Sequence, residues 1–302
     1  MSICLHDSNL TSDRLDMKKV SFIGLGVMGF PMAGHLHNAG YQVTVYNRTT
    51  KKAENWLEQY GGAMALTPAQ AAKDSDIVFI CVGNDDDLRQ VTLGADGVFS
   101  TMKNNAIVVD HTTASANIAR ELAEKAVSLD LNFLDAPVSG GEVGAINGQL
   151  SVMVGGEQAH YQAVESAIAS YAKFSKLLGP VGSGQLAKMM NQICIAGVVQ
   201  GLAEALHFGQ NAGLDCAQVV EVISQGAAGS WQMDNRHKTM LNNEYDFGFA
   251  VDWMRKDLDI ALTEAKSNGS TLPLTALVDQ FYADVQKNGG NRWDTSSLLT
   301  RL

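Results

Sequence analysis

The sequence predicts an α/β domain built on a parallel sheet, followed by an all-helical domain. Short runs rich in Val and Ile alternate with helical stretches through the first half of the 302 residues, as in strands joined by crossover helices. The runs IVFICV and AIVV show no polar alternation, as expected of strands covered on both faces. Beyond residue 180 the apolar residues follow helical spacing, and no convincing strand is found.

Six strands are expected in the first domain, with helical segments between most of them. They cover Val20–Gly24, Val43–Tyr46, Ile77–Val82, Ile107–Asp110, Phe133–Asp135 and Leu150–Val154. Gly179-Pro180-Val181-Gly182 interrupts this pattern, so we place a domain boundary near residue 180. Four helices are expected beyond it, over Gln185–Ala212, Ala217–Ser224, Val251–Asn268 and Leu274–Lys287.

This division gives a sheet domain over 17–180 and a helical domain over 181–302. Residues 1–16 are polar and lack the basic start and long apolar core of a signal peptide. We expect them to be dispensable, as an N-terminal tail that precedes the first strand.

Composition excludes several classes of function. A hydrophobic content of 46% with 18% charged residues is typical of a soluble globular protein. The net charge of −10 disfavours nucleic acids and anionic membranes as partners. The four cysteines have no metal-ligand spacing, so no metal site is expected and a reducing cytoplasm fits best.

A glycine motif follows the first expected strand. Gly24, Gly26 and Gly29 form GxGxxG in the stretch GLGVMG, which opens a helix and leads to a second strand. In a Rossmann domain these glycines allow a tight turn, close approach of a pyrophosphate, and close packing of helix on strand. We therefore expect a dinucleotide to bind along this turn, including its intervening residues Leu25, Val27 and Met28.

The residues after the second strand favour NADP over NAD. An NAD site usually presents an acidic residue there to the ribose hydroxyls, whereas this chain has Asn47, Arg48 and Thr49. Arg48 is suited to stack on adenine and to pair with a 2′-phosphate. The alternative is that Arg48 is a solvated turn residue and that NAD is used.

Lys188 is the only charged residue in an otherwise apolar stretch of the first helix beyond the boundary. Asn191 and Gln192 lie three and four residues later, on the same helix face. A lysine in an apolar wall costs desolvation energy unless it has a partner or a role, so we expect a proton donor flanked by orienting amides. The alternative is a lysine that extends its amine to solvent. The polar residues also argue against a membrane-spanning helix.

A second glycine-rich turn follows the fifth expected strand, in the stretch DAPVSGG. Ser139, Gly140 and Gly141 offer a hydroxyl and backbone N–H groups that suit a carboxylate. Taken alone, the stretch is equally compatible with a tight structural loop.

Four motifs stand in order along the chain: GLGVMG at 24–29, DAPVSGG at 135–141, GSGQLAKMMNQ at 182–192 and RKDLDIA at 255–261. This ordered set closely resembles the β-hydroxyacid dehydrogenase family, which includes 3-hydroxyisobutyrate, tartronate semialdehyde and glyoxylate/succinic semialdehyde enzymes. The resemblance covers about residues 18 to 290, essentially the whole chain.

The resemblance implies roles for particular residues. Lys188 matches the catalytic lysine, and Ser139, Gly140 and Gly141 match the loop that holds the substrate carboxylate. Asn191 matches the first asparagine of a K-x-x-N-N pattern, whereas Gln192 replaces the second and adds a methylene.

Further matches concern the nicotinamide end of the site. Thr112 matches a threonine or serine near nicotinamide and substrate, and Lys256 and Asp257 match a Lys-Asp pair there. The remaining matches are two cofactor-lining residues and an aromatic of the semialdehyde reductases, namely Val82, Gly83 and Phe249.

The resemblance implies hydride transfer between NAD(P) and a small β-hydroxyacid or its semialdehyde, with a small carboxylate as substrate and a homodimer or homotetramer as assembly. An NADPH-dependent glyoxylate/succinic semialdehyde reductase is one alternative. A non-catalytic dinucleotide-binding or scaffold protein is another, although retention of Lys188 argues against it.

Overall fold

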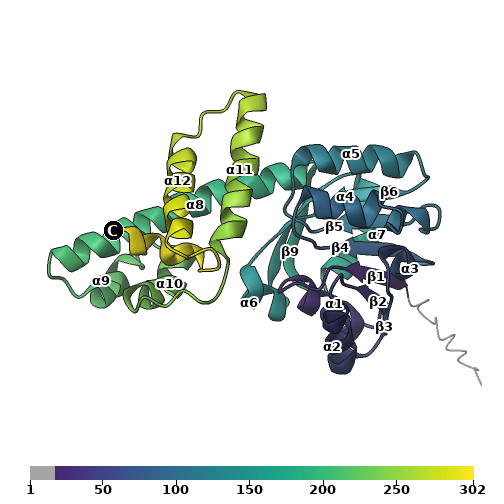
Figure 1. The fold of residues 1–302 in the computed structure, drawn as a ribbon, viewed down its shortest axis with the longest axis horizontal. Coiled ribbons are helices and arrows are strands. Elements are labelled where there is room, and N and C mark those ends of the chain that lie inside the picture. The colour runs from purple at the N-terminus through teal and green to yellow at the C-terminus, as the bar shows by residue number, and fades with distance from the viewer. Residues whose placement is uncertain (1–17) are drawn as a thin grey trace, which may run out of the picture.

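Two domains joined by one long helix make up the fold, in a computed structural model that describes residues 18–302 (Figure 1). The first domain contains the strands β1 (Lys19–Ile23), β2 (Gln42–Tyr46), β3 (Ala63–Met64), β4 (Ile77–Ile80), β5 (Ile107–Asp110), β6 (Asn132–Asp135), β7 (Val138–Ser139), β8 (Leu150–Gly155) and β9 (Ala172–Gly179). Its helices are α1 (Gly29–Asn38), α2 (Thr50–Tyr60), α3 (Pro68–Ala72), α4 (Asp85–Leu93), η1 (Val98–Ser100), α5 (Ala116–Val127), α6 (Gly141–Ile146) and α7 (Gln158–Ile168).

The sheet has the order β3-β2-β1-β4-β5-β6-β8-β7, and β9 pairs with β8. The pairs from β3 to β6 are parallel, and β8 runs antiparallel to β6 and β7. Strand order reverses between β1 and β4. In open α/β sheets the ligand crevice lies at such a point, beyond the carboxyl ends of the strands. The cofactor and substrate motifs predicted from the sequence follow β1, β2, β4, β5 and β6 at this edge.

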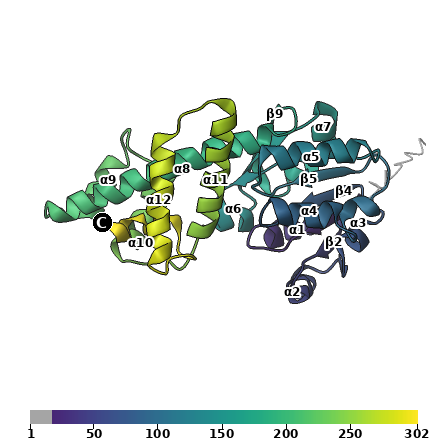
Figure 2. The same cartoon turned by 45° about the horizontal axis from the view of Figure 1, so that its top comes forward.

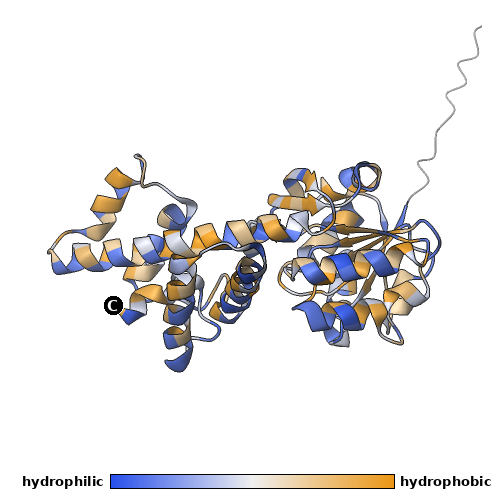
Figure 3. Cartoon of the chain, turned by 90° about the horizontal axis from the view of Figure 1, so that it is seen from above, coloured by the Kyte–Doolittle hydropathy of each residue, from blue (hydrophilic) through white to orange (hydrophobic). Residues whose placement is uncertain are grey.

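The apolar strands lie between helices that cover both faces of the sheet (Figure 3). One core lies on the α1 and α2 side, where Trp56 and Met32 are fully buried. A second core lies on the other face, around Leu88 and Ile118. Burial on both faces explains why the central strands lack polar alternation, and all six predicted strands are present.

Three strands were not predicted. β3 and β7 contain two residues each, too few for a sequence pattern. β9 reads AKFSKLLG and is largely exposed along one side, including Phe174. Its lysines interrupt the apolar pattern, as is common in strands at the edge of a sheet.

The second domain consists of helices packed around α8 (Ser183–Asn211), with α9 (Cys216–Ile223), α10 (Trp231–Leu241), α11 (Val251–Asn268), α12 (Pro273–Lys287) and η2 (Thr295–Arg301). α8, α9, α11 and α12 confirm the four predicted helices. α10 was not predicted, because its sequence WQMDNRHKTML buries few apolar residues. Ser230 nonetheless starts it by accepting the backbone N–H of Met233 at 3.0 Å.

α8 belongs to both domains. Its first turns pack against β8 and β9, and its later turns pack against α10, α11, α12 and η2 (Figure 2). The length and mean hydropathy of α8 would also suit a membrane-spanning helix, but this packing is that of a central helix of a globular domain. The boundary near residue 180 stays a prediction, and the tail over 1–16 lies outside the described residues.

Candidate active site

The glycine turn after β1 has the shape that a dinucleotide requires. Gly24 has φ +100°, and a Cβ there would lie 2.2 Å from the Cys81 carbonyl oxygen. A Cβ on Gly29 would lie 2.0 Å from the carbonyl oxygen of Gly24. A Cβ on Gly26, in contrast, would meet no atom of residues 18–302 within 4 Å beyond its own chain neighbours. Gly24 and Gly29 therefore serve packing, whereas Gly26 leaves open space for a ligand backbone.

The residues around this turn fit a phosphate group. α1 begins at Gly29, and within residues 18–302 its N-cap Met28 makes no side-chain capping hydrogen bond. Helix N-termini attract anions because their first N–H groups have no partner within the helix. The backbone N–H of Leu25 donates to Asn47 Oδ1 at 2.9 Å, which ties the turn to the end of β2. Val27 is exposed beside it.

Arg48 follows β2, where the adenosine end of a dinucleotide is expected in a sheet of this order. Its side chain is 77% exposed and pairs with Asp87 of α4 at 3.0 Å. Thr49 is the N-cap residue of α2. An exposed guanidinium is free to rearrange toward a phosphate, because a surface ion pair contributes little free energy. Asp87 competes with a 2′-phosphate for Arg48. The sequence after β2 does not reveal this carboxylate, because Asp87 lies in α4.

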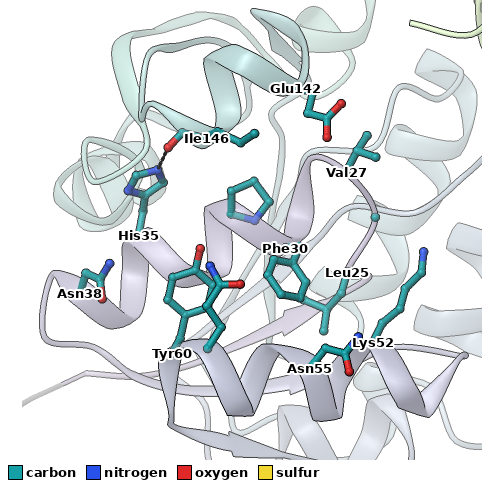
Figure 4. A pocket seen from close by; sticks show the side chains of 13 residues that line it. Leu25, Val27, Phe30, His35, Asn38, Lys52, Asn55, Tyr60, Glu142 and Ile146 are labelled. Atoms are coloured by element: carbon teal, nitrogen blue, oxygen red, sulfur yellow. Dashed lines mark hydrogen bonds between the residues drawn. The ribbon is translucent and has the colours of Figure 1, made fainter. Parts of the chain in front are cut away.

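A groove of about 630 Å³ flanks the turn on the side away from the sheet (Figure 4). It lies between α1, α2 and α6, and its lining includes Phe30, Tyr60, Lys52 and Glu142. Lys188, Asn191 and Gln192 are not among the lining residues. The groove therefore flanks the glycine turn and is separate from the polar residues of α8.

Lys188 is almost fully buried, with 8% of its surface exposed. Burial lowers the pKa of its amine from 10.5 to about 8, Asp257 opposes this shift, and Lys256 adds to it. An amine with a pKa near neutrality can donate or accept a proton under ordinary conditions. The structure thus supports a buried lysine rather than one that extends to solvent.

A continuous chain of polar contacts runs beside Lys188 and joins the two domains. Ser139 Oγ donates to Asn191 Oδ1 at 3.3 Å, and Asn191 Nδ2 donates to Gln192 Oε1 at 2.8 Å. Gln192 Nε2 then donates to Asp257 Oδ2 at 2.7 Å. Asp257 Oδ1 pairs with Lys256 Nζ at 3.1 Å. The extra methylene of Gln192 is compatible with a direct bond to Asp257.

Lys256 extends this chain to the end of β5, where its amine donates to the Thr113 carbonyl oxygen. Thr112 itself is buried, and its hydroxyl accepts the backbone N–H of Val82 at 3.1 Å. The Thr112 hydroxyl therefore holds the backbone just after β4, next to Gly83. Thr113 is partly exposed beside it and was not singled out from the sequence.

The carboxylate loop stands next to the same cluster. Gly140 and Gly141 have φ +138° and +63°, and both are exposed. Gly141 is the first residue of the short helix α6, two residues after Ser139. Phe249 is partly buried against the core of the helical domain, where packing accounts for its position.

Two buried residues anchor the helix that carries Lys188. Asp135 accepts the backbone N–H groups of Gly182 and Gln185 at 2.7 and 2.8 Å, so its carboxylate caps α8. The Gln185 side chain donates to the Thr112 carbonyl oxygen at 2.7 Å and accepts the Ala114 N–H at 3.1 Å. Neither residue was selected from the sequence, although Asp135 opens the DAPVSGG motif.

Two family models together match almost the whole described chain. The NAD binding domain of 6-phosphogluconate dehydrogenase matches residues 19–189. The family described as NAD-binding of NADP-dependent 3-hydroxyisobutyrate dehydrogenase matches residues 182–302. The chain belongs to the β-hydroxyacid dehydrogenase family. It is an NAD(P)-dependent oxidoreductase with a Rossmann domain and a helical domain.

Individual relatives agree with this assignment over nearly their full length. A protein named uncharacterized oxidoreductase in Shewanella frigidimarina is 66% identical and covers 95% of this chain and 98% of its own. The 2-hydroxy-3-oxopropionate reductase of Escherichia coli is 34% identical, and the match covers 94% of this chain and 97% of the reductase. A 3-hydroxyisobutyrate dehydrogenase of Mycobacterium tuberculosis, solved with L-serine, has a TM-score of 0.85 at 27% identity and covers 94% and 99%.

The geometry indicates how this chain supports the reaction of its family. When bound, the nicotinamide supplies or accepts the hydride. The buried Lys188 amine, with a pKa of about 8, can release or take up a proton near neutral pH. The polar chain from Ser139 to Asp257 runs beside it and connects the two domains.

Proposed function

We propose that this protein is an NADP-preferring reductase and dehydrogenase that interconverts a small 3-hydroxy acid and its semialdehyde, with Lys188 as the catalytic acid and base. The observation that carries the proposal is the buried Lys188 amine, whose pKa is about 8, next to the Ser139–Asn191 contact. Within residues 18–302 the Lys188 amine makes no hydrogen bond or ion pair and is only influenced at longer range by Asp257, which favours a catalytic role over a structural one.

The substrate class follows from what surrounds Lys188. Ser139, Gly140 and Gly141 offer a hydroxyl and backbone N–H groups, which suit a carboxylate. We infer that the carboxylate sits at this loop and that the carbonyl lies toward Lys188. We infer an acid with three or four carbons, since the reductase of Escherichia coli acts, by its name, on a three-carbon compound of this type.

NADP preference rests on Arg48 and on the lack of a carboxylate at the end of β2 in Asn47-Arg48-Thr49. The ion pair with Asp87 keeps Arg48 near the crevice. Reduction of glyoxylate or succinic semialdehyde is a second candidate within the same chemistry, favoured by Asn47-Arg48-Thr49 after β2.

We further propose a soluble, cytoplasmic homo-oligomer. Cys81, Cys194 and Cys216 are free thiols in the described part of the chain, which suits a reducing compartment. Exposed apolar residues on the helical domain, such as Phe208 and Val222, offer a surface for a second copy. Size-exclusion chromatography with light scattering measures the assembly directly.

Steady-state oxidation of NADPH and NADH tests the activity. The aldehydes to be compared are methylmalonate semialdehyde, tartronate semialdehyde, succinic semialdehyde and glyoxylate. Turnover of a three- or four-carbon semialdehyde with NADPH preferred is the expected result. Tight NADPH binding without turnover of any of them contradicts the proposed substrate class.

A further inference from the structure

Trp253 is an aromatic residue that the reaction described above does not use. It lies in the first turn of α11, and 38% of its surface is exposed, although its neighbours Val251 and Met254 are fully buried. A large indole left partly exposed keeps apolar surface in water, which costs free energy. The helical core therefore gives no reason for a tryptophan at this position.

The exposed indole faces the cofactor domain. A Cβ placed on Gly83 would lie 3.5 Å from Trp253 Cη2 and 2.6 Å from Asp87 Oδ2. Gly83 follows β4, at the crevice edge where the sheet changes direction. The indole of one domain therefore lies close to the loop after β4 of the other, with room for little more than a methyl group at Gly83.

Lys256, three residues after Trp253 on α11, also contacts the carboxyl edge of the sheet. Its amine lies 5.9 Å from the centroid of the Trp253 ring and bonds the Thr113 carbonyl oxygen after β5. Trp253 and Lys256 thus reach two adjacent strand ends, β4 and β5, from one helix. Both ends lie on the β4–β5 side of the point where strand order reverses, whereas Arg48 follows β2 and reaches this side only through its ion pair with Asp87.

We propose that Trp253 is an interdomain clamp that packs its indole against the nicotinamide riboside half of the bound cofactor. The proposal rests on the proposed function, because it takes a dinucleotide as the ligand. An indole offers a flat apolar face, and a flat heteroaromatic ring or a ribose face packs well on it. The oxidised, cationic nicotinamide gains an additional attraction to the ring face.

Binding measurements on the full two-domain chain separate this role from a general structural one. We would titrate NADPH, and the 2′-phosphorylated ADP fragment that lacks the nicotinamide riboside, into wild type, W253A and W253F. Loss of an aromatic contact predicts a Kd for NADPH about three- to tenfold higher in W253A. The Kd for the fragment is expected to stay within about twofold of wild type, and W253F is expected to restore most of the affinity for NADPH.

Tryptophan fluorescence provides a second test that does not require W253A to fold. Reduced nicotinamide absorbs where tryptophan emits, so NADPH quenches an indole that lies against it. W253F is expected to lose a measurable part of this quenching, while Trp56 of the cofactor domain retains its own share. W231F is the matched control, because Trp231 is 53% exposed and packs on Arg236 in α10, away from the crevice, and it is expected to keep the quenching.

Each contrary result has a defined meaning. Equal loss of affinity for NADPH and for the fragment in W253A, or full quenching in W253F, overturns the clamp and leaves the proposed function standing. A wild-type protein that binds neither NADPH nor NADH overturns the proposed function together with the clamp.

Discussion

Replacing Lys188 with Met should stabilise the protein while abolishing its proposed activity. The amine is buried, and its pKa falls from 10.5 to about 8 in the folded protein. Below pH about 8 both the folded and unfolded states carry the proton, so the folded state bears the full cost of the buried charge. At about 1.4 kcal/mol per pH unit of pKa difference, this cost is about 3 kcal/mol.

The pH dependence gives the sign of the effect. Between pH about 8 and 10.5 the unfolded state still binds the proton while the folded state has released it, so the wild type gains stability as pH rises. Methionine has no such dependence. The advantage of K188M should therefore shrink from about 3 kcal/mol at about pH 7 to about 1 kcal/mol at about pH 9.5.

Chemical denaturation of both proteins at the two pH values measures this difference. Asp257 keeps Lys256 at 3.1 Å and Gln192 at 2.7 Å after the substitution, so its buried charge stays compensated. Lys238→Met is a matched control on an exposed position of α10 and should change stability by less than about 0.5 kcal/mol. A K188M protein that is less stable than wild type, or an advantage that grows with pH, refutes the reasoning.

Three further predictions follow from the cofactor turn and from the anchor of α8. Gly26→Ala should keep wild-type stability but weaken NADPH binding tenfold or more. Gly29→Ala should lose about 3 kcal/mol of stability, because its Cβ would meet the Gly24 carbonyl oxygen at 2.0 Å. Calorimetry measures the binding and denaturation measures the stability, and equal behaviour of the two variants contradicts this prediction. Asp135→Ala leaves the buried N–H groups of Gly182 and Gln185 unpaired and should cost about 2–4 kcal/mol in urea unfolding; a loss below about 0.5 kcal/mol shows that the cap is unimportant. Arg48→Ala should raise the KM for NADPH about tenfold and leave that for NADH within about twofold, and equal effects on both cofactors argue against a 2′-phosphate contact.

The parts of the fold that could be predicted are those set by local sequence. The glycine turn is one case, because the φ of Gly24 and the close contact at Gly29 each leave room for no other residue. The central strands are another, since burial on both faces makes them continuously apolar. β9 escaped because an exposed edge strand tolerates the lysines of AKFSKLLG.

The parts of the site that could not be predicted depend on contacts between distant residues. Lys188, Asn191 and Gln192 were found together because helical spacing places them on one face. The bond from Gln192 to Asp257 spans 65 residues, and no pattern on either helix reveals it. Thr112 illustrates the same limit, because its motif gives its place after β5 but not the direction in which its hydroxyl points.

Trp253 and Asp87 were also beyond the reach of sequence patterns. Each contacts a residue of another element: Trp253 lies beside Gly83, and Asp87 pairs with Arg48. Only the packing of α11 against the loop after β4 brings the indole to the crevice.

The pH dependence of the reaction in both directions tests the role of Lys188 most directly. We would measure kcat/KM for semialdehyde reduction with NADPH and for alcohol oxidation with NADP, in wild type and in Lys188→Arg. If Lys188 is the proton donor, reduction should fall and oxidation should rise through a common pKa of about 8. Lys188→Arg should lose that transition and about a hundredfold or more of the rate, because arginine does not release its proton at this pH. Retention of full turnover and of the same pH profile in Lys188→Arg would contradict the assignment.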